Sequence, residues 1–218
     1  MAGGLLLRLT VRAAAMIWNV HYFASGRRTP ACDTAPMGVC AAILAGGAGS
    51  RIGGDKALVQ LAGRPLIAYP LAAAEQAELA RVVVAKADTR LPPLPATVSV
   101  LREPDERRHP LLGVLTALSA FPAVIAIPCD MPFIDADALV ELAAMPQQLA
   151  TLYAGEPFPS LYRRGALPAL RAAVGSNRSL RSVHADSACA RVSDPAALTF
   201  SVNTPADLAA AGQRLSRR

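Results

Sequence analysis

The apolar positions of this 218-residue chain form short continuous runs that alternate with amphipathic stretches. A continuous apolar run predicts a buried strand over residues 39–45, and segments rich in β-branched residues predict strands over residues 81–87, 96–101 and 123–129. Segments rich in helix formers predict helices over residues 65–77, 111–121 and 135–145, with Pro65 as a first helical residue and Asp135 as a cap. This alternation indicates an α/β protein with a three-layer, Rossmann-like fold, in which helices flank a mostly parallel sheet.

The second half of the chain continues the alternation without a repeat or a low-complexity linker. Strands are predicted over residues 149–155, 158–163 and 198–202, and helices over residues 166–174, 179–185 and 204–215. Thr204 suits the cap of the last helix, and Pro205 suits its first position. We therefore predict a single domain over residues 37–218.

Residues 1–36 differ from the rest of the chain in composition. Four arginines against one aspartate give this segment half of the formal net charge of +6. Its apolar stretch carries Asn19 and His21 and falls short of the roughly 20 apolar residues that a membrane span requires. We interpret the segment as an extension that is disordered or untranslated, with Met37 beginning the folded protein, and we expect no membrane partner.

The remaining charge and the cysteines limit the possible functions. From Met37 onward the chain is only mildly basic and its Lys/Arg clusters are short, so we expect no nucleic-acid partner. The cysteines lie far apart and form neither a Cys-x-x-Cys pair nor a metal spacing with histidine; they are Cys32, Cys40, Cys129 and Cys189. Free thiols are typical of a cytoplasmic protein, which is the location we expect.

The first predicted strand runs into a loop suited to phosphate. Ligands of parallel α/β sheets bind at the carboxyl ends of the strands. The loop offers glycines for close backbone approach and cations for phosphate charge: Gly46, Gly47, Gly49, Arg51 and Lys56. A P-loop is absent because Ala57 follows Lys56, and the dinucleotide fingerprint fails at Ile52, which disfavours a nicotinamide-dependent oxidoreductase.

The strand over residues 123–129 ends in a carboxylate, Asp130. Pro128 and Pro132 restrict the backbone on either side of it. Mg²⁺ takes one or two carboxylates together with substrate phosphates, so Asp130 is a candidate metal ligand beside a bound nucleotide. Asp135 and Asp137 are better interpreted as residues that begin a helix.

Together these motifs resemble a known family. "LAGGAGSRIGGDKALVQLAGRPLI" (44–67) and "IPCDMPF" (127–133) are similar to the signature and the metal-binding strand end of the MobA-like nucleotidyltransferases, which make molybdopterin dinucleotide cofactors. Further similar segments follow in the family's order at residues 109–118, 158–183 and 201–208. The resemblance therefore spans residues 39–210 and leaves out the first 36.

The resemblance implies a set of site residues. The implied nucleotide contacts are Leu44, Ala45, Gly46, Gly47, Gly49, Lys56, Asp105 and Asp130. Asp105 is the preferred second acidic residue, with Glu103 as the alternative, because spacing does not choose between them. Arg51, Lys56 and Asp130 are the implied catalytic residues, Asp130 would hold Mg²⁺, and Asn203 would contact the pterin substrate.

The resemblance also implies a reaction. The terminal phosphate of molybdopterin, or of its molybdate-loaded form, would attack the α-phosphorus of GTP and release pyrophosphate, with molybdoenzymes or their chaperones as recipients of the product. Gly46 favours GTP, since cytidylyl relatives read Leu-Ala-Ala-Gly at this position. The alternatives are a nucleotidyltransferase that uses CTP or another phosphorylated acceptor such as phospholactate, and a non-catalytic nucleotide-binding adaptor.

Two residues depart from the family pattern. His109 stands before Pro110 where the family usually has glycine, and Ser201 replaces an asparagine often found two places before Asn203. The histidines lack the context of a catalytic triad, and we interpret them as structural or surface residues.

Overall fold

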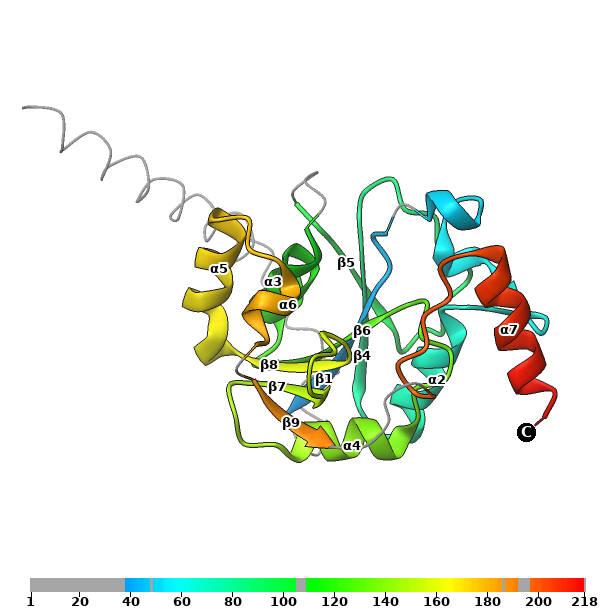
Figure 1. Cartoon of the computed structure of the whole chain (residues 1–218). Coiled ribbons are helices and arrows are strands. Elements are labelled where there is room, and N and C mark those ends of the chain that lie inside the picture. The colour runs from blue at the N-terminus through cyan, green and yellow to red at the C-terminus, as the bar shows by residue number, and fades with distance from the viewer. Residues whose placement is uncertain (1–37, 48, 105–108, 186, 192–196, 218) are drawn as a thin grey trace, which may run out of the picture. The chain divides into compact units, whose positions relative to one another are not determined.

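A twisted sheet of seven strands forms the centre of the part that the structure describes (Figure 1). This computed structural model describes residues 38–217 except 48, 105–108, 186 and 192–196, so the predictions for residues 1–36, Cys32 and Asp105 lie outside it. The strand order is β5-β4-β1-β6-β8-β7-β9, and only β8 runs antiparallel to its neighbours. The strands are β1 (Val39–Leu44), β4 (Ala80–Ala85), β5 (Ser99–Arg102), β6 (Ala123–Pro128), β7 (Leu149–Tyr153), β8 (Ser160–Arg163) and β9 (Ala188–Arg191).

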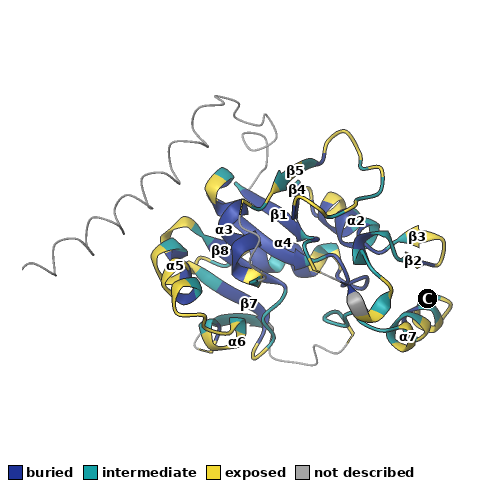
Figure 2. Ribbon diagram, turned by 90° about the horizontal axis from the view of Figure 1, so that it is seen from above, coloured by how far each residue is buried: buried dark blue, intermediate teal, exposed yellow. Residues whose placement is uncertain are grey.

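Helices cover both faces of the sheet, as the alternation of the sequence predicts. Alternate residues of β1 enter two separate cores: Ala41 and Ile43 pack on one face, whereas Cys40 and Ala42 pack on the other. The first face is covered by α2 (Ala68–Gln76) and α4 (Ala136–Ala144), and the second by α3 (Pro110–Ala120) and α5 (Leu167–Gly175). Figure 2 shows the sheet as the buried layer between them, which confirms the predicted three-layer fold.

The remaining elements lie around this sandwich. They are the 3-10 helices η2 (Ser50–Ile52), η3 (Lys56–Leu58) and η4 (Arg164–Ala166), the short strands β2 (Gln60–Leu61) and β3 (Arg64–Pro65), and the helices α6 (Leu180–Val183) and α7 (Pro205–Leu215). None of the helices in the described residues is long and apolar enough to cross a membrane.

The strand order creates a switch point between β1 and β6. The chain moves from β1 to β4 and β5 on one side and then returns to place β6 on the other side. Leu44 at the end of β1 lies opposite Val84 of β4 and Pro128 of β6, so these three strands end at the same level. A crevice at the carboxyl ends of such strands is the expected ligand site of an open α/β sheet.

Helix caps agree with the sequence, but one predicted helix start and one predicted strand are wrong. Asp135 accepts a hydrogen bond from the Ala138 N–H at 2.8 Å and caps α4, and Thr204 caps α7 as predicted. Pro65 does not begin a helix, since it pairs in β3 opposite Gln60 and α2 starts three residues later. The predicted strand over residues 198–202 is absent too, because its Val202 N–H donates to the Asp130 carbonyl at 2.9 Å instead of joining the sheet.

A buried histidine makes the stability of this fold depend on pH. His184 is 5% exposed, and its Nε2 lies 2.8 Å from the hydroxyl of Tyr162, which is itself fully buried. Burial lowers the pKa of His184 to about 4, so folding favours the neutral ring. In the unfolded chain the ring titrates near 6.5, so the unfolded state binds more protons between these values.

We therefore expect the contribution of His184 to the free energy of unfolding to be complete well above pH 6.5 and to fall as the pH drops toward 4. The expected loss is about 2 kcal/mol between pH 8 and pH 5. Urea unfolding of the wild type and of His184→Gln at several pH values measures it. The variant should start lower and lose less, and equal slopes for both proteins would contradict the assignment.

Candidate active site

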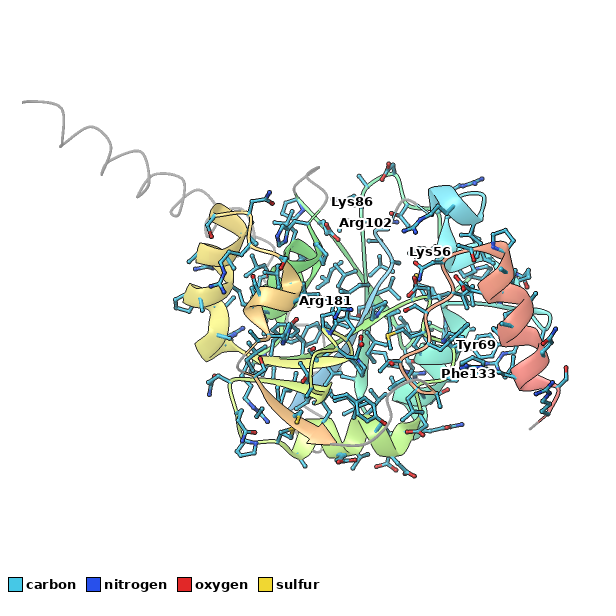
Figure 3. The ribbon with its side chains drawn as sticks, in the orientation of Figure 1. Lys56, Tyr69, Lys86, Arg102, Phe133 and Arg181 are labelled. Atoms are coloured by element: carbon cyan, nitrogen blue, oxygen red, sulfur yellow. The ribbon has the colours of Figure 1, made fainter. Side chains whose placement is uncertain are left out.

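A cavity of about 360 Å³ opens at the switch point, where the sequence predicts the site. Its walls come from the loops that follow β1, β4, β5 and β6 and from the beginning of α3. The lining residues are Leu44, Gly46, Gly47, Lys56, Lys86, Glu103, His109, Pro110, Gly113, Pro128, Cys129, Asp130 and Phe158. Figure 3 shows that Lys56 and Lys86 both lie at this end of the sheet.

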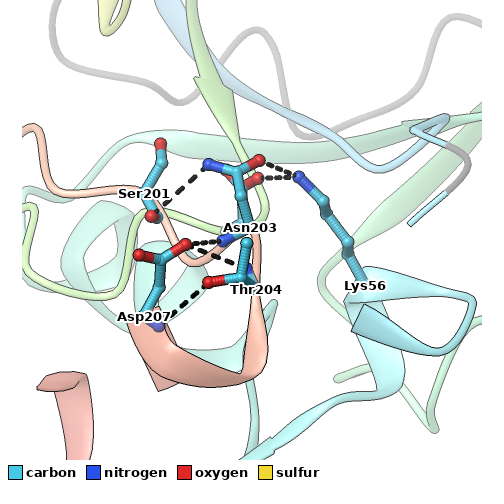
Figure 4. A network of polar contacts seen from close by, with 6 residues as sticks. Lys56, Ser201, Asn203, Thr204 and Asp207 are labelled. Atoms are coloured by element: carbon cyan, nitrogen blue, oxygen red, sulfur yellow. Dashed lines mark hydrogen bonds and ion pairs between the residues drawn. The ribbon is translucent and has the colours of Figure 1, made fainter. Parts of the chain in front are cut away.

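Lys56 joins the first loop to two distant segments of the chain. Its Nζ donates to Asp130 Oδ2 at 2.5 Å and to the Asn203 side-chain oxygen at 2.6 Å (Figure 4). The side chains of Lys56 and Asp130 are only 17% and 9% exposed, so their charges attract each other with little screening by water. The lysine therefore holds the carboxylate and the amide in one cluster.

The start of α7 fixes the position of Asn203. Asp207 accepts hydrogen bonds from the Asn203 N–H at 3.0 Å and the Thr204 N–H at 2.9 Å, and its own N–H donates to Thr204 Oγ1. These bonds, above all the one from the Asn203 backbone, lower the pKa of Asp207, and the charge of Arg51 lowers it further. This capping box at the start of α7 holds Asn203 where its side chain can bond to Lys56.

One oxygen of Asp130 is poised to bind a cation. Asp130 Oδ1 is buried and has no hydrogen-bond partner among the described residues, although Oδ2 is bound to Lys56. A buried carboxylate oxygen without a partner is costly unless a ligand satisfies it. In the described residues no three His, Cys, Asp or Glu side chains form a ready-made metal site. Mg²⁺ nevertheless fits this position, because it commonly takes one carboxylate, waters and substrate phosphates.

The glycine loop turns back on itself at Gly49. The residue has φ +56°, and a Cβ built there would lie 1.7 Å from the Gly54 carbonyl oxygen. The Gly54 N–H donates to the Gly49 carbonyl at 3.1 Å and closes the turn. Gly49 therefore allows the loop to turn, and the turn directs the chain back so that Lys56 enters the cavity.

A second buried ion pair stands at the β4–β5 side of the cavity. Lys86 Nζ lies 3.0 Å from Glu103 Oε2, and the two side chains are 11% and 8% exposed. A Cβ on Gly46 would meet Glu103 Oε1 at 2.9 Å, so the glycine allows the carboxylate to reach the loop. Lys86 was not among the predicted site residues. A lysine near the carboxyl end of the predicted strand over residues 81–87 could have revealed it, because ligands of parallel sheets bind at these strand ends.

The cavity thiol is held in its neutral form. Burial, and next the charge of Asp130, raise the pKa of Cys129 to about 12. A thiol with this pKa is not ionised at neutral pH, and the thiolate is the nucleophilic form. Cys129 is therefore a packing residue of the wall.

The structure brings together most of the residues predicted for the nucleotide. Leu44, Gly46, Gly47, Lys56 and Asp130 line the cavity. The buried Ala45 donates its N–H to the Val84 carbonyl at 2.8 Å, behind the lining residues. Asn203 reaches the cavity through Lys56, whereas Arg51 is exposed and stands outside the described lining.

A glycine loop, a lysine and a carboxylate at the switch point of a parallel sheet define a nucleotide-binding α/β protein. A family model described as "MobA-like NTP transferase domain" matches residues 41–192. The chain therefore belongs to the MobA-like NTP transferase family and is a nucleotidyltransferase.

Individual relatives agree with this assignment. A molybdenum cofactor guanylyltransferase from Xanthomonas euvesicatoria pv. vesicatoria (strain 85-10) is 33% identical over 162 residues, which cover 69% of this chain and 80% of the relative. A molybdenum cofactor guanylyltransferase from Rhodobacter capsulatus is 32% identical over 186 residues, which cover 82% of this chain and 97% of the relative. Both alignments include most of the domain predicted from the sequence.

Solved structures share the fold at lower identity. Molybdopterin-guanine dinucleotide biosynthesis protein A from Archaeoglobus fulgidus has a TM-score of 0.65 at 20% identity, covering 82% of this chain and 99% of that one. The 2-C-methyl-D-erythritol 4-phosphate cytidylyltransferase from Thermus thermophilus has a TM-score of 0.59 at 20% identity, covering 82% and 99%. The fold alone therefore does not show which nucleotide the chain uses.

Proposed function

We propose that the chain transfers GMP from GTP to the terminal phosphate of molybdopterin or its molybdate-loaded form. An oxygen of that phosphate attacks the α-phosphorus of GTP, the bond from this phosphorus to the bridging oxygen breaks, and pyrophosphate leaves with its electron pair. The product is a guanine dinucleotide joined by a new phosphoanhydride, available to molybdoenzymes or their chaperones. The reaction takes place in the cytoplasm.

The Lys56–Asp130 cluster carries the proposal. Two polyanions must approach each other, so the site has to position them and neutralise charge rather than supply a nucleophile. Lys56 can donate to phosphate oxygens from its place between Asp130 and Asn203. The backbone of Leu44, Ala45 and Gly46 is assigned to the guanine and ribose.

The other site residues have supporting roles. Gly47 and Gly49 give the loop a shape that lets its N–H groups face phosphate, and Arg51 would add charge from outside the cavity. Asp105 is assigned as the second acidic nucleotide contact, and Glu103, which lines the cavity, is the alternative for the same role. Mg²⁺ bound at Asp130 would supply charge neutralisation on the phosphates. Asn203 is assigned to the pterin side, next to Lys56.

The choice of GTP rests on sequence. The two relatives at 33% and 32% identity are named guanylyltransferases. Leu44 and Ala45 precede Gly46 and Gly47, the Leu-Ala-Gly-Gly form that the guanylyl branch carries. A cytidylyl enzyme with the same fold would keep Lys56 and Asp130, so the base must be tested directly.

We expect the full chain to convert GTP, molybdopterin and Mg²⁺ into a guanine dinucleotide with an equimolar yield of pyrophosphate. Parallel incubations with GTP and with CTP, separated by chromatography and identified by mass, measure this. A cytidine dinucleotide would show that CTP, and not GTP, is the nucleotide substrate. GTP binding without a dinucleotide product would contradict the proposed reaction and favour an adaptor.

A further inference from the structure

His109 links the cavity wall to a segment that does not line the cavity. The residue stands before α3 and is a lining residue, and its Nε2 lies 3.1 Å from the Arg178 carbonyl, between α5 and α6. Its Nδ1 lies 3.2 Å from the Leu111 N–H. The carbonyl can only accept and the N–H can only donate, so both bonds are satisfied by the neutral ring with its proton on Nε2.

The two bonds of the ring have different consequences. The Nδ1 bond caps α3. The first N–H groups of a helix have no partner within the helix, and Nδ1 accepts from one of them, the Leu111 N–H. The Nε2 bond instead ties the wall to the turn that contains Asn177 and Arg178, where Asn177 has φ +50°. α3 also packs against α5, so the bond between His109 and Arg178, called the bridge below, connects the ends of two neighbouring helices.

The linked segment is strongly cationic. Residues 160–185 contain five arginines and no aspartate or glutamate. Arg164, Arg171, Arg178 and Arg181 are exposed. Arg181, which lies in α6 (Figure 3), donates to the Gly155 carbonyl at 3.1 Å and stands 4.0 Å from Glu156 Oε2, so three of the four exposed arginines have no ion pair among the described residues. A segment with this net positive charge attracts an anionic ligand, and none of its residues is among those that line the cavity with Lys56.

We propose that His109 is a positioning residue that holds this arginine-bearing segment against the cavity wall and thereby sets the affinity for the second, phosphorylated substrate. The proposal rests on the proposed function, in which the nucleotide occupies the glycine loop and a second polyanion must enter beside it.

Two substitutions separate the two bonds. In His109→Asn the side-chain oxygen takes the place of Nδ1 and keeps the cap, but the side chain is too short to reach Arg178. In His109→Gln the amide nitrogen takes the place of Nε2 and keeps the bridge, but the cap is lost. We expect the asparagine variant to raise the KM for the phosphorylated acceptor about tenfold, with kcat and the KM for GTP within about twofold.

The glutamine variant should show the opposite behaviour. Its acceptor KM should remain close to the wild-type value, while its Tm falls by about 2–4 °C from the lost cap. An unchanged acceptor KM in His109→Asn, or an equal rise in the KM for GTP, would overturn the inference.

Hydrogen exchange of the full chain tests the same bridge without turnover. In His109→Asn the amides of residues 177–183 should exchange faster while that of Leu111 stays protected, and His109→Gln should reverse this. A wild type that makes no dinucleotide would refute the proposed function alone, because the exchange pattern still tests the bridge. The same exchange pattern in both variants would refute the role of His109.

Discussion

Replacing Asp130 by asparagine is expected to lower kcat/KM for GMP transfer by about 10³-fold in a protein that still folds, although Lys56 loses its counter-charge. Asparagine has the same size and keeps an oxygen that can accept from Lys56, which lies 2.5 Å from Oδ2 in the wild type. The variant loses the negative charge at the buried Oδ1, which has no partner among the described residues. A neutral amide binds Mg²⁺ far more weakly than a carboxylate does.

The measurement combines turnover with metal binding. Initial rates are recorded over a range of Mg²⁺ concentrations, and Mn²⁺ binding to the protein is followed by the loss of the free-ion electron paramagnetic resonance signal. Asp135→Asn is the matched control, because Asp135 caps α4 through the Ala138 N–H and asparagine caps a helix equally well. Unchanged turnover of Asp130→Asn at limiting Mg²⁺ would remove this residue from the metal role.

The position of the site was predictable from strand ends alone. β1 and β6 are continuous apolar runs, and a parallel sheet brings their carboxyl ends to one edge. The glycine loop after one strand and Asp130 after the other had to be neighbours once the two strands paired, although Lys56 and Asp130 are 74 residues apart. The local sequence pattern and the strand topology together were therefore sufficient to place the glycine loop beside Asp130.

The contacts between side chains were not predictable in the same way. Asn203 was assigned to the pterin side from its motif, but its bond to Lys56 depends on how the segment before α7 crosses the sheet edge. That crossing also explains the wrong strand over residues 198–202, whose apolar pattern reflects packing of Phe200 against Phe133 at 5.8 Å between ring centroids. Apolar periodicity identifies a buried face without stating which surface covers it.

Replacing Lys56 by methionine is expected to lower kcat by about 10²–10³-fold and, at the same time, to tighten the binding of a divalent cation in the absence of nucleotide. The ammonium group directs two of its protons at Asp130 Oδ2 and the Asn203 oxygen, at 2.5 and 2.6 Å. A cation that binds Oδ1 would therefore lie close to the ammonium group, whose positive charge repels it. Methionine preserves the length of the side chain and removes its charge.

The same substitution leaves Asp130 buried without its counter-charge. Breaking a buried pair by removing one partner typically costs about 3–5 kcal/mol of unfolding free energy. A divalent cation that binds only the folded state restores part of this loss by mass action. The Tm of Lys56→Met should accordingly rise with Mg²⁺ concentration more steeply than the wild-type Tm does.

The opposite changes in Mn²⁺ affinity that are expected of the two variants separate the role of Lys56 from that of Asp130. Both lose turnover, but Mn²⁺ affinity should fall in Asp130→Asn and rise in Lys56→Met. Lys86→Met is the comparison for the metal measurement, since Lys86 is a second buried lysine of the same cavity paired with Glu103 at 3.0 Å. It should leave the affinity of Asp130 for Mn²⁺ unchanged. Weaker or unaltered Mn²⁺ binding in Lys56→Met would contradict the expected repulsion between the lysine and a cation at Asp130.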